Sequence, residues 1–355
     1  MNIQIEKTAK SRLGEVDFSK VEFGNVFSDH MFSQKWEDGA WQSARIIPYG
    51  PVALNPAALG LHYGQTVFEG LKAYRGTRDG ILRLFRPEKN GKRLVQSCER
   101  LCIPAIRVED FIEAVTALVS LDRDWVPKSR LQTLYLRPIL FGTEGHLAVR
   151  PASAYDFLIV AAPVSEYFDR AGPGIYLKAE DRFTRAAPGG TGAAKTSGNY
   201  AATLRPTGDS LAEGFNQVLW LDAHEHGYVE EAGQMNIFFR IDDTVVTPSL
   251  SGTILPGVTR ESVLALLEEW GIHTEERRIS MEEIQDASKD GILREAFGAG
   301  TAAVVAPVRS IQYRGVDIAV PDAAPDMLCS RLYDELTGIQ YGEVADRYGW
   351  TVPIS

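Results

Sequence analysis

Apolar residues recur along this chain at two spacings, one typical of helices and the other typical of strands. Residues 109–121 show helical spacing, because the apolar side chains that share one face are Phe111, Val115, Leu118 and Val119. The same reasoning predicts further helices over residues 90–102, 199–205, 259–270, 281–287 and 324–341.

Runs rich in β-branched and aromatic residues, bounded by turn-forming residues, predict strands. These runs are residues 80–85, 131–140, 156–164, 217–222, 236–241, 244–247 and 297–305. Side chains alternate between the two faces of a strand, so Tyr135 and Arg137 are expected to share a face. Asp242 and Asp243 predict a hairpin turn between two of these strands.

The pattern changes in the middle of the chain, where residues 165–185 have few sustained apolar runs and contain a Gly-Pro-Gly turn signal. A chain of 355 residues is too long for one small core, so two domains are expected. We predict a small N-terminal domain over residues 1–168, an interdomain linker over 169–184 and a large C-terminal domain over 185–355. The mixture of helices and strands predicts an α+β protein made of two α/β domains.

The composition, with 45% hydrophobic and 24% charged residues, is typical of a soluble globular protein. A net charge of -10 argues against nucleic acid as a partner. The longest apolar stretch, residues 157–164, is too short to span a membrane, and residues 1–7 lack the apolar core of a signal peptide. Three cysteines indicate reduced thiols and a cytoplasmic protein. Cys98 and Cys102 are expected to fill the core rather than bind a metal.

The main chemical candidate is Lys195, which lies among small residues in the glycine-rich loop 189–200. Small neighbours let a bulky group approach the backbone. A lysine that is buried or close to other cations loses its proton more easily and becomes a nucleophile. The alternative is a solvated surface charge, as for most lysines.

Residues 189–196 also resemble the phosphate loop G-x-x-x-x-G-K-[ST] of nucleotide-binding proteins. The glycine that lets that loop wrap around phosphates is replaced by Ala194. Residues 182–188, which precede the loop, are a poor buried strand. This context disfavours a nucleotide-binding module but leaves it as an alternative from another functional class.

Glu231 follows Lys195 by 36 positions and lies directly before a predicted strand, in the sequence Glu-Ala-Gly-Gln-Met-Asn. One interpretation is an exposed acidic pair with Glu230. The other is a carboxylate that faces a pyridine nitrogen and favours its protonated form. A protonated pyridine ring is the electron sink of pyridoxal phosphate (PLP).

Residues 255–260, Leu-Pro-Gly-Val-Thr-Arg, open a predicted helix and are candidates for a phosphate site. Free amides at Val258 and Thr259, the helix dipole and the Thr259 hydroxyl all favour an anion. Thr301 offers a further hydroxyl in Gly-Thr-Ala. Without a phosphate site, residues 255–260 would be an ordinary turn into a helix, and Thr301 would lie in a packed core strand. A lysine, a carboxylate and a helix start together match the aldehyde, the ring nitrogen and the phosphate of PLP.

In this order and spacing, the motifs resemble the fold-type IV PLP enzymes and, within them, the branched-chain amino acid aminotransferases. The resemblance runs through most of the chain, over residues 23–31, 62–73, 84–87, 134–138, 195–200, 231–236, 255–260 and 297–302.

The resemblance implies a role for each matching residue. Lys195 is implied to be catalytic and to bond covalently to PLP. The other implied cofactor-binding residues are Arg93, Tyr200, Glu231, Val258, Thr259 and Thr301. The implied substrate-binding residues are Phe23, Tyr63, Phe68, Tyr135, Arg137, Leu147, Val149, Tyr167, Gln234 and Ala302. Among them, Arg137 resembles the arginine that binds the glutamate side chain, and Leu147 and Val149 resemble contributions from the second subunit of a homodimer.

Two features depart from the pattern of relatives. Ala303 and Ala306 stand where some members have a C-x-x-C pair, so no redox switch of that kind is expected. Gln234 stands where relatives often have a smaller residue, which puts the local contacts to the substrate carboxylate in doubt.

The resemblance implies transamination between L-leucine, L-isoleucine or L-valine and 2-oxoglutarate. The products are branched-chain 2-oxo acids and L-glutamate, in the last step of synthesis or the first step of breakdown of these amino acids. No metal ion is implied. A D-amino acid aminotransferase and an aminodeoxychorismate lyase, which share the fold, are the alternatives.

Overall fold

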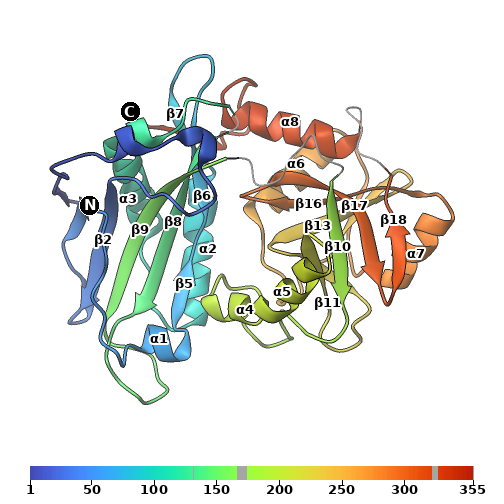
Figure 1. The fold of residues 1–355 in the computed structure, drawn as a ribbon, viewed down its shortest axis with the longest axis horizontal. Coiled ribbons are helices and arrows are strands. Elements are labelled where there is room, and N and C mark those ends of the chain that lie inside the picture. The colour runs from blue at the N-terminus through green and yellow to red at the C-terminus, as the bar shows by residue number, and fades with distance from the viewer. Residues whose placement is uncertain (131, 166–173, 322–326, 355) are drawn as a thin grey trace. The chain divides into compact units, whose positions relative to one another are not determined.

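The computed structural model describes residues 1–130, 132–165, 174–321 and 327–354 (Figure 1). The chain divides into two compact units. The first unit comprises Met1–Tyr167, Ala194–Ser197 and Gly338–Ser355, and the second comprises Phe168–Ala193 and Gly198–Thr337. Lys195 therefore belongs to the first unit, although the residues on both sides of its short segment belong to the second.

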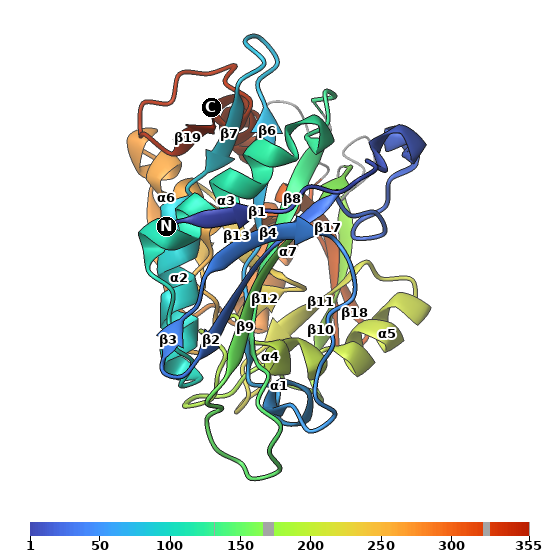
Figure 2. The ribbon, with the colours of Figure 1, turned by 90° about the vertical axis from the view of Figure 1, so that its left-hand side faces the viewer.

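The first unit is built around a mostly antiparallel sheet. Its strands are β1 (Ile3–Ile5), β2 (His30–Glu37), β3 (Ala40–Trp41), β4 (Ala44–Pro48), β5 (Thr66–Phe68), β6 (Leu71–Arg75), β7 (Leu82–Phe85), β8 (Thr133–Gly142), β9 (Tyr155–Val164) and β19 (Thr351–Ile354). They pair in the order β1-β4-β2-β9-β8-β6-β7-β19, with β3 paired to β2 and β5 paired to β8. Strand β4 lies between β1 and β2 (Figure 2), and the β1–β4 pair is parallel.

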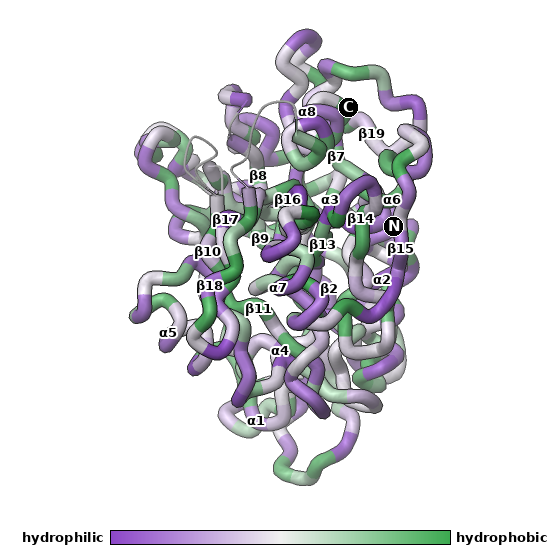
Figure 3. Tube along the Cα trace, turned by 90° about the vertical axis from the view of Figure 1, so that its right-hand side faces the viewer, coloured by the Kyte–Doolittle hydropathy of each residue, from purple (hydrophilic) through white to green (hydrophobic). Residues whose placement is uncertain are grey.

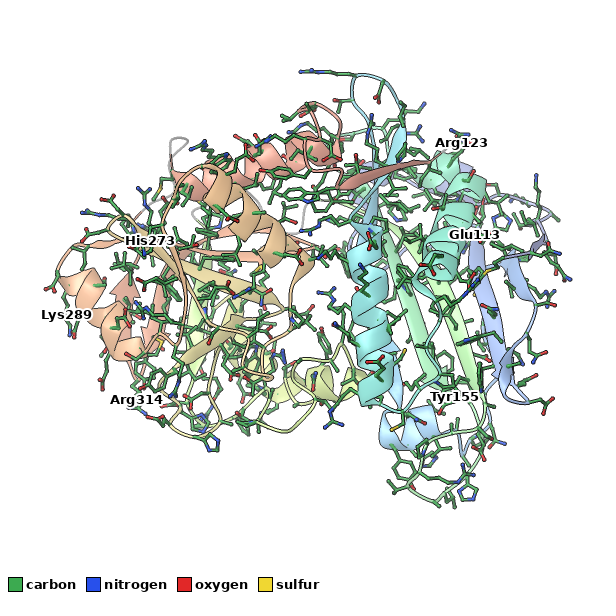
Figure 4. All side chains as sticks on the ribbon, turned by 180° about the vertical axis from the view of Figure 1, so that it is seen from behind. Glu113, Arg123, Tyr155, His273, Lys289 and Arg314 are labelled. Atoms are coloured by element: carbon green, nitrogen blue, oxygen red, sulfur yellow. The ribbon has the colours of Figure 1, made fainter. Side chains whose placement is uncertain are left out.

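Helices cover one face of this sheet. They are α1 (Leu59–Tyr63), α2 (Pro87–Arg100) and α3 (Val108–Leu121), with short 3-10 turns at Leu13–Glu15, Phe18–Lys20 and Arg123–Trp125. In Figure 4, α2 and the helix that carries Glu113, α3, lie over the strands. Leu94 of α2 and Phe111 of α3 are fully buried with Phe32 and Phe157 of the sheet. The apolar stripe predicted for residues 109–121 therefore faces the core.

The second unit contains a sheet that closes on itself. Its strands are β10 (Ile175–Glu180), β11 (Gln217–Leu221), β12 (Val229–Ala232), β13 (Met235–Ile241), β14 (Thr244–Thr247), β15 (Thr274–Glu276), β16 (Leu293–Gly300), β17 (Val304–Tyr313) and β18 (Val316–Ala319). They pair in the order β12-β11-β10-β17-β16-β13-β14-β15, and β12 pairs with β13 as well. The strands from β10 to β13, with β16 and β17, thus form a ring in which β12 has a partner on each side.

Helices flank the strands of the second unit. They are α4 (Ser197–Ala201), α5 (Leu204–Ala212), α6 (Val258–Glu269), α7 (Met281–Lys289) and α8 (Leu328–Gln340). The first residue of α4 and the last three residues of α8 are counted with the first unit. Alternate side chains of β13 face opposite ways, because Ile237 packs in a cluster that includes Ile284 of α7, whereas Phe238 stacks on Phe297 at 5.2 Å between ring centroids. Figure 3 shows hydrophobic stretches along β17 and hydrophilic stretches in surface loops.

Most of the predicted elements are confirmed, with shifted ends. The prediction of one strand over residues 297–305 is wrong, because the run contains a turn at 301–303 between β16 and β17. Small apolar residues conceal this turn, since they are equally typical of a buried strand. Val304 then adopts a φ of +61°, which is rare for a β-branched residue.

Several elements were not predicted from the sequence. Strands β2 and β4 carry charged side chains on their outer positions and lack a clean apolar run. Strand β10 lies within the segment that was predicted as a linker. Strand β19 brings the end of the chain back to the first unit by pairing with β7. The predicted domain boundaries themselves remain predictions.

The cysteine prediction was correct for one residue of the pair. Cys98 is buried in the core of the first unit, and burial raises the pKa of its thiol to about 12. Cys102 is exposed, because α2 ends at Arg100 and the chain turns with a φ of +54° at Cys102. Within the described part of the chain, every helix is too short or too polar to cross a lipid bilayer.

We expect that Ile354→Ala will lower the free energy of unfolding by about 2 kcal/mol, because Ile354 is 4% exposed and packs in the core of the first unit. Pro353→Ala, at an exposed position of the same strand, is the control and should change it by less than about 0.5 kcal/mol. Urea unfolding of both variants measures the difference. Equal effects would show that β19 contributes no core packing.

Candidate active site

In the first unit, the main chain around Lys195 is bound on two sides. The carbonyl of Lys195 accepts a hydrogen bond from the Phe68 amide at 3.0 Å, and the Thr196 hydroxyl donates to the carbonyl of Thr66 at 2.7 Å. The Lys195 amide donates to Oγ of Ser97 at 2.9 Å. The side-chain amine lies 5.1 Å from the centroid of the Phe68 ring. Lys195 is thus half-buried on a fixed backbone, not a freely solvated loop residue.

A buried ion pair lies beside Lys195. Arg93 on α2 contacts Glu69 through Nε at 2.7 Å and Nη2 at 2.9 Å, and Asn90 donates to the same carboxylate at 2.8 Å. Glu69 is fully buried. Burial raises the pKa of Glu69, but the charges of Arg93 and Lys195 and the hydrogen bonds outweigh it and lower that pKa below its ordinary value. Arg93, a predicted phosphate-binding residue, is therefore oriented by Glu69.

The predicted arginine and aromatic residues form one cluster in this unit. The guanidinium of Arg137 lies 4.8 Å from the Phe68 ring centroid and 5.3 Å from that of Tyr135, and its Nη2 donates to the Tyr135 hydroxyl at 3.1 Å. Phe23 packs edge-on against Tyr135 at 4.9 Å. Nε of Arg137 is buried and has no partner among the described residues, so the guanidinium retains a donor for another group.

A glycine makes this cluster possible. A Cβ atom on Gly70 would lie 2.0 Å from the Tyr135 hydroxyl, closer than any real contact. Strand β6 begins directly after Gly70 and pairs with β8, which carries Tyr135, so the close approach follows from the sheet itself.

The remaining predicted residues of this unit lie on its surface. The Tyr63 hydroxyl donates to the carbonyl of Leu147, which joins α1 to the loop after β8. Leu147 and Val149 are 68% and 81% exposed. Such exposed aliphatic side chains fit a contact with another subunit, which remains a proposal. Tyr167 lies outside the described residues.

In the second unit, both carboxylate oxygens of Glu231 are bound. Arg185 pairs with Oε2, and the amide of Leu255 donates to Oε1 at 2.9 Å. Both side chains of the pair are buried. Burial lowers the pKa of Arg185, but the charge and hydrogen bond of Glu231 outweigh it and raise that pKa. Nη2 of Arg185 also donates to the carbonyl of Gly192 at 3.2 Å, so the same cation binds the glycine-rich loop.

The start of α6 is attached to Glu231 and its neighbour on β13. Asn236 pairs with Glu231 across the two strands and donates to the carbonyl of Leu255 at 3.0 Å. The two main-chain groups of Leu255 are therefore bound by residues that lie side by side. A Cβ atom on Gly257 would lie 2.0 Å from Oδ1 of Asn236, so any other residue there would displace the Asn236 amide.

The N-terminus of α6 retains the features expected of a phosphate site. Among the described residues no side chain caps the helix at Gly257, and Val258 and Thr259 of its first turn are buried. The first amides of a helix have no partner inside the helix and favour an anion. This is the chemistry predicted for residues 255–260.

The other predicted residues of the second unit lie in turns and short helices. Tyr200 is on α4. Its phenol helps to raise the pKa of Arg185, by less than Glu231 raises it and by less than burial lowers it. Thr301 and Ala302 form the turn between β16 and β17, and Gln234 lies in the turn between β12 and β13. These two turns are adjacent, because the carbonyl of Gln234 would lie 3.6 Å from a Cβ on Gly300.

Sequence reasoning missed Glu69, Ser97 and Arg185. For the first two, the available signal was proximity to predicted site residues: Glu69 is next to Phe68, and Ser97 is one helical turn after Arg93. Arg185 gave no signal, because it lies in a segment without regular periodicity.

Glu230 points away from this set and lines a pocket of about 490 Å³ with Thr253, Tyr228 and Arg278. The Thr253 hydroxyl donates to its Oε1, and among the described residues no group binds its Oε2. Burial raises the pKa of Glu230 to about 7. The acidic pair Glu230-Glu231 is therefore not exposed, and only one of the two residues has a cation as a direct partner.

Residues 66–311 match the family described as amino-transferase class IV. The chain belongs to this family. The predicted α+β, fold-type IV architecture is confirmed with it, and the nucleotide-binding alternative is rejected.

Similar proteins of this family share nearly the full length of the chain. The chain is 46% identical to branched-chain-amino-acid aminotransferase 2 of Bacillus subtilis over 99% of this chain and 97% of that protein. It is 47% identical to branched-chain-amino-acid transaminase 1 of the same species, over 99% of both.

The structure is similar to solved branched-chain amino acid aminotransferases. That of Escherichia coli has a TM-score of 0.75 and 26% identity, covering 91% of this chain and 99% of the other. Another solved enzyme of this name, complexed with N-(5'-phosphopyridoxyl)-L-glutamate, has a TM-score of 0.72 and 25% identity, covering 91% and 98%. The resemblance stated from the motifs is confirmed.

Glu230→Gln should change the pH dependence of stability. The folded protein keeps the Glu230 proton up to about pH 7, whereas the unfolded chain releases it near the ordinary value of 4.5. The contribution of Glu230 to stability is therefore complete below that ordinary value and is lost as the pH rises through 7. The variant should gain about 1–3 kcal/mol relative to the parent between pH 5 and pH 8.5.

Urea unfolding of the apoprotein at several pH values measures this gain. Glu225→Gln, at an exposed glutamate of the same pocket, is the control and should show no comparable trend. A parallel pH dependence of Glu230→Gln and the parent would show that Glu230 ionises normally in the folded protein.

Proposed function

We propose that this chain transfers the amino group between branched-chain L-amino acids and 2-oxoglutarate, with PLP as its cofactor. The observation that carries the proposal is Lys195, on a backbone bound from two sides, in a chain 46% identical over 354 residues to a named branched-chain aminotransferase. The predicted enzyme class, reaction and cofactor are confirmed by the family and its relatives.

The residues present fit the cofactor. Lys195 supplies the amine for the aldehyde. Glu231, in its ion pair with Arg185, supplies the charge for the ring nitrogen, and Tyr200 a donor for the phenolic oxygen. The uncapped start of α6, at Val258 and Thr259, offers amides for the phosphate, and the family resemblance assigns Thr301 and Arg93 to the same group. When bound, PLP supplies the electron sink that stabilises a carbanion at the amino acid's α-carbon.

The chemistry of the chain itself is proton transfer by Lys195. Its amine would take the α-proton of the amino acid as a base and would then release it as an acid. Both roles require an amine that is held in one position. The hydrogen bonds of the Lys195 amide and carbonyl fix the position from which the side chain works.

The cluster around Arg137 accounts for two kinds of substrate. Rings of Phe68, Tyr135 and Phe23 provide apolar surface for a leucine-like side chain. The guanidinium of Arg137 lies among these rings and its Nε donor has no partner among the described residues, so it can pair with the side-chain carboxylate of glutamate. The family resemblance also assigns substrate binding to Tyr63, Tyr167, Gln234 and the backbone of Ala302.

Two further properties are proposed from the sequence and the family. A homodimer follows from the family resemblance, and the exposed Leu147 and Val149 would then reach the partner's substrate site. A cytoplasmic location follows from the three free cysteines.

Lys195→Ala should abolish the visible absorbance of covalently attached PLP and reduce transamination of L-leucine below about 0.1% of the parent rate, because the only proposed proton carrier is removed. Absorbance spectra with and without L-leucine, and a coupled assay, measure both effects. Lys289→Ala, at an exposed lysine of α7 labelled in Figure 4, is the control. Borohydride reduction and peptide mapping should place the label on Lys195, and a label elsewhere would overturn the assignment.

Arg137→Met should reduce kcat/KM for L-glutamate about 10- to 100-fold more than for L-leucine, since a charge-assisted hydrogen bond is lost only with the dicarboxylic substrate. Arg137→Lys retains the charge without the planar fork and should give an intermediate ratio. Steady-state kinetics with both amino acids measure the ratio. Equal losses for the two substrates would assign Arg137 a structural role alone.

A further inference from the structure

Ser97 is a fully buried hydroxyl on α2 that contacts the main chain of Lys195. Its Oγ accepts a hydrogen bond from the Lys195 amide at 2.9 Å. The same hydroxyl donates a hydrogen bond to the carbonyl of Arg93, one helical turn earlier, also at 2.9 Å. The bond to Arg93 uses the only hydrogen of the hydroxyl, so the lone pairs face Lys195. The hydroxyl therefore both donates and accepts a hydrogen bond, and these two bonds fix its orientation.

The same helix turn carries Arg93, whose guanidinium is bound by Glu69. Glu69 directly follows Phe68, and the Phe68 amide donates to the Lys195 carbonyl at 3.0 Å. These contacts link the residues in a ring. Lys195 contacts Ser97, which lies on α2 with Arg93. Arg93 binds Glu69, and the neighbouring Phe68 contacts Lys195 again. Positions 93 and 97 are four apart, so one turn of helix separates the two anchors.

We propose that Ser97 is a positioning residue, which fixes the reach of the Lys195 amine relative to the proposed phosphate ligand Arg93. The proposal rests on the proposed function, because it assigns Lys195 the proton transfer. Without the Ser97 hydroxyl, the Lys195 amide loses this buried acceptor, while the bond from the Phe68 amide to the Lys195 carbonyl is retained. Binding of cofactor and substrate by other residues would be retained, while the amine would reach the α-proton less often.

Ser97→Ala, Ser97→Thr and the parent are compared as holoenzyme and after removal and re-addition of PLP. For Ser97→Ala we expect kcat with L-leucine to fall about 10-fold or more with KM changed less than about 3-fold. The kinetic isotope effect with α-deuterated L-leucine should increase, because proton transfer becomes the slow step. After re-addition of PLP, covalent attachment, followed by absorbance, should be slower than PLP uptake, followed by tryptophan fluorescence.

The controls separate positioning from general stability. Ser97→Thr retains the hydroxyl and should restore most of the rate; a folded threonine variant no faster than Ser97→Ala would overturn the proposal. Thr337→Val removes another buried helical hydroxyl, which donates to the carbonyl of Tyr333, and should leave the isotope effect unchanged. If Ser97→Ala is insoluble, Ser97→Cys keeps the shape of the side chain with a larger atom that is a weaker acceptor, and it should show the same trend.

A Ser97→Ala or Ser97→Cys protein with the parent's isotope effect and attachment rate would overturn the proposal, whatever its melting temperature. The proposed function is tested separately by the parent. If the parent does not attach PLP at Lys195 or does not transaminate L-leucine, the proposed function fails, whereas the role of Ser97 is decided by the ratio of variant to parent.

Discussion

The second unit depends on the burial of one carboxylate, that of Glu231. A buried charge is tolerated only when it is paired and hydrogen-bonded, and Glu231 meets this demand with Arg185 and the Leu255 amide. Each partner has a second function in the fold. Arg185 also binds the glycine-rich loop at Gly192, and Leu255 leads into α6. The residue proposed to face the cofactor ring therefore also positions the segment proposed to bind its phosphate.

The first unit solves a related problem with a different pair. Glu69 is fully buried and binds Arg93 through two nitrogen atoms, which leaves the arginine with a fixed direction. An arginine that is proposed to bind phosphate has to be held without losing its charge, and a bidentate carboxylate does this. In both units a buried ion pair and a hydrogen bond to the backbone order the groups that the reaction requires. Lys195, whose amine is proposed to react, belongs to a segment of four residues, 194–197, that joins the sheet of the first unit.

The proposed substrate site shows how one pocket can accept unlike side chains. Arg137 lies between two aromatic rings, and such contacts satisfy a guanidinium without a carboxylate partner. An aliphatic side chain can therefore pack on the same rings without leaving a bare buried charge. In the proposed site, a glutamate side chain would instead pair with the Nε donor of Arg137, which no described residue engages. Gly70 is the structural condition for this arrangement, because any side chain there would displace the Tyr135 hydroxyl.

The sequence alone determined the family, most of the regular elements and the identity of Lys195, Glu231 and residues 255–260 as candidates, because those features depend on local spacing and on residue types placed in order. The order of the strands, the closure of β12 onto β13 and the return of β19 to β7 were decided only by the tertiary structure. The same holds for Glu69, Ser97 and Arg185. Their importance comes from partners 24, 98 and 46 positions away, and periodicity along a chain carries no information about contacts over such separations.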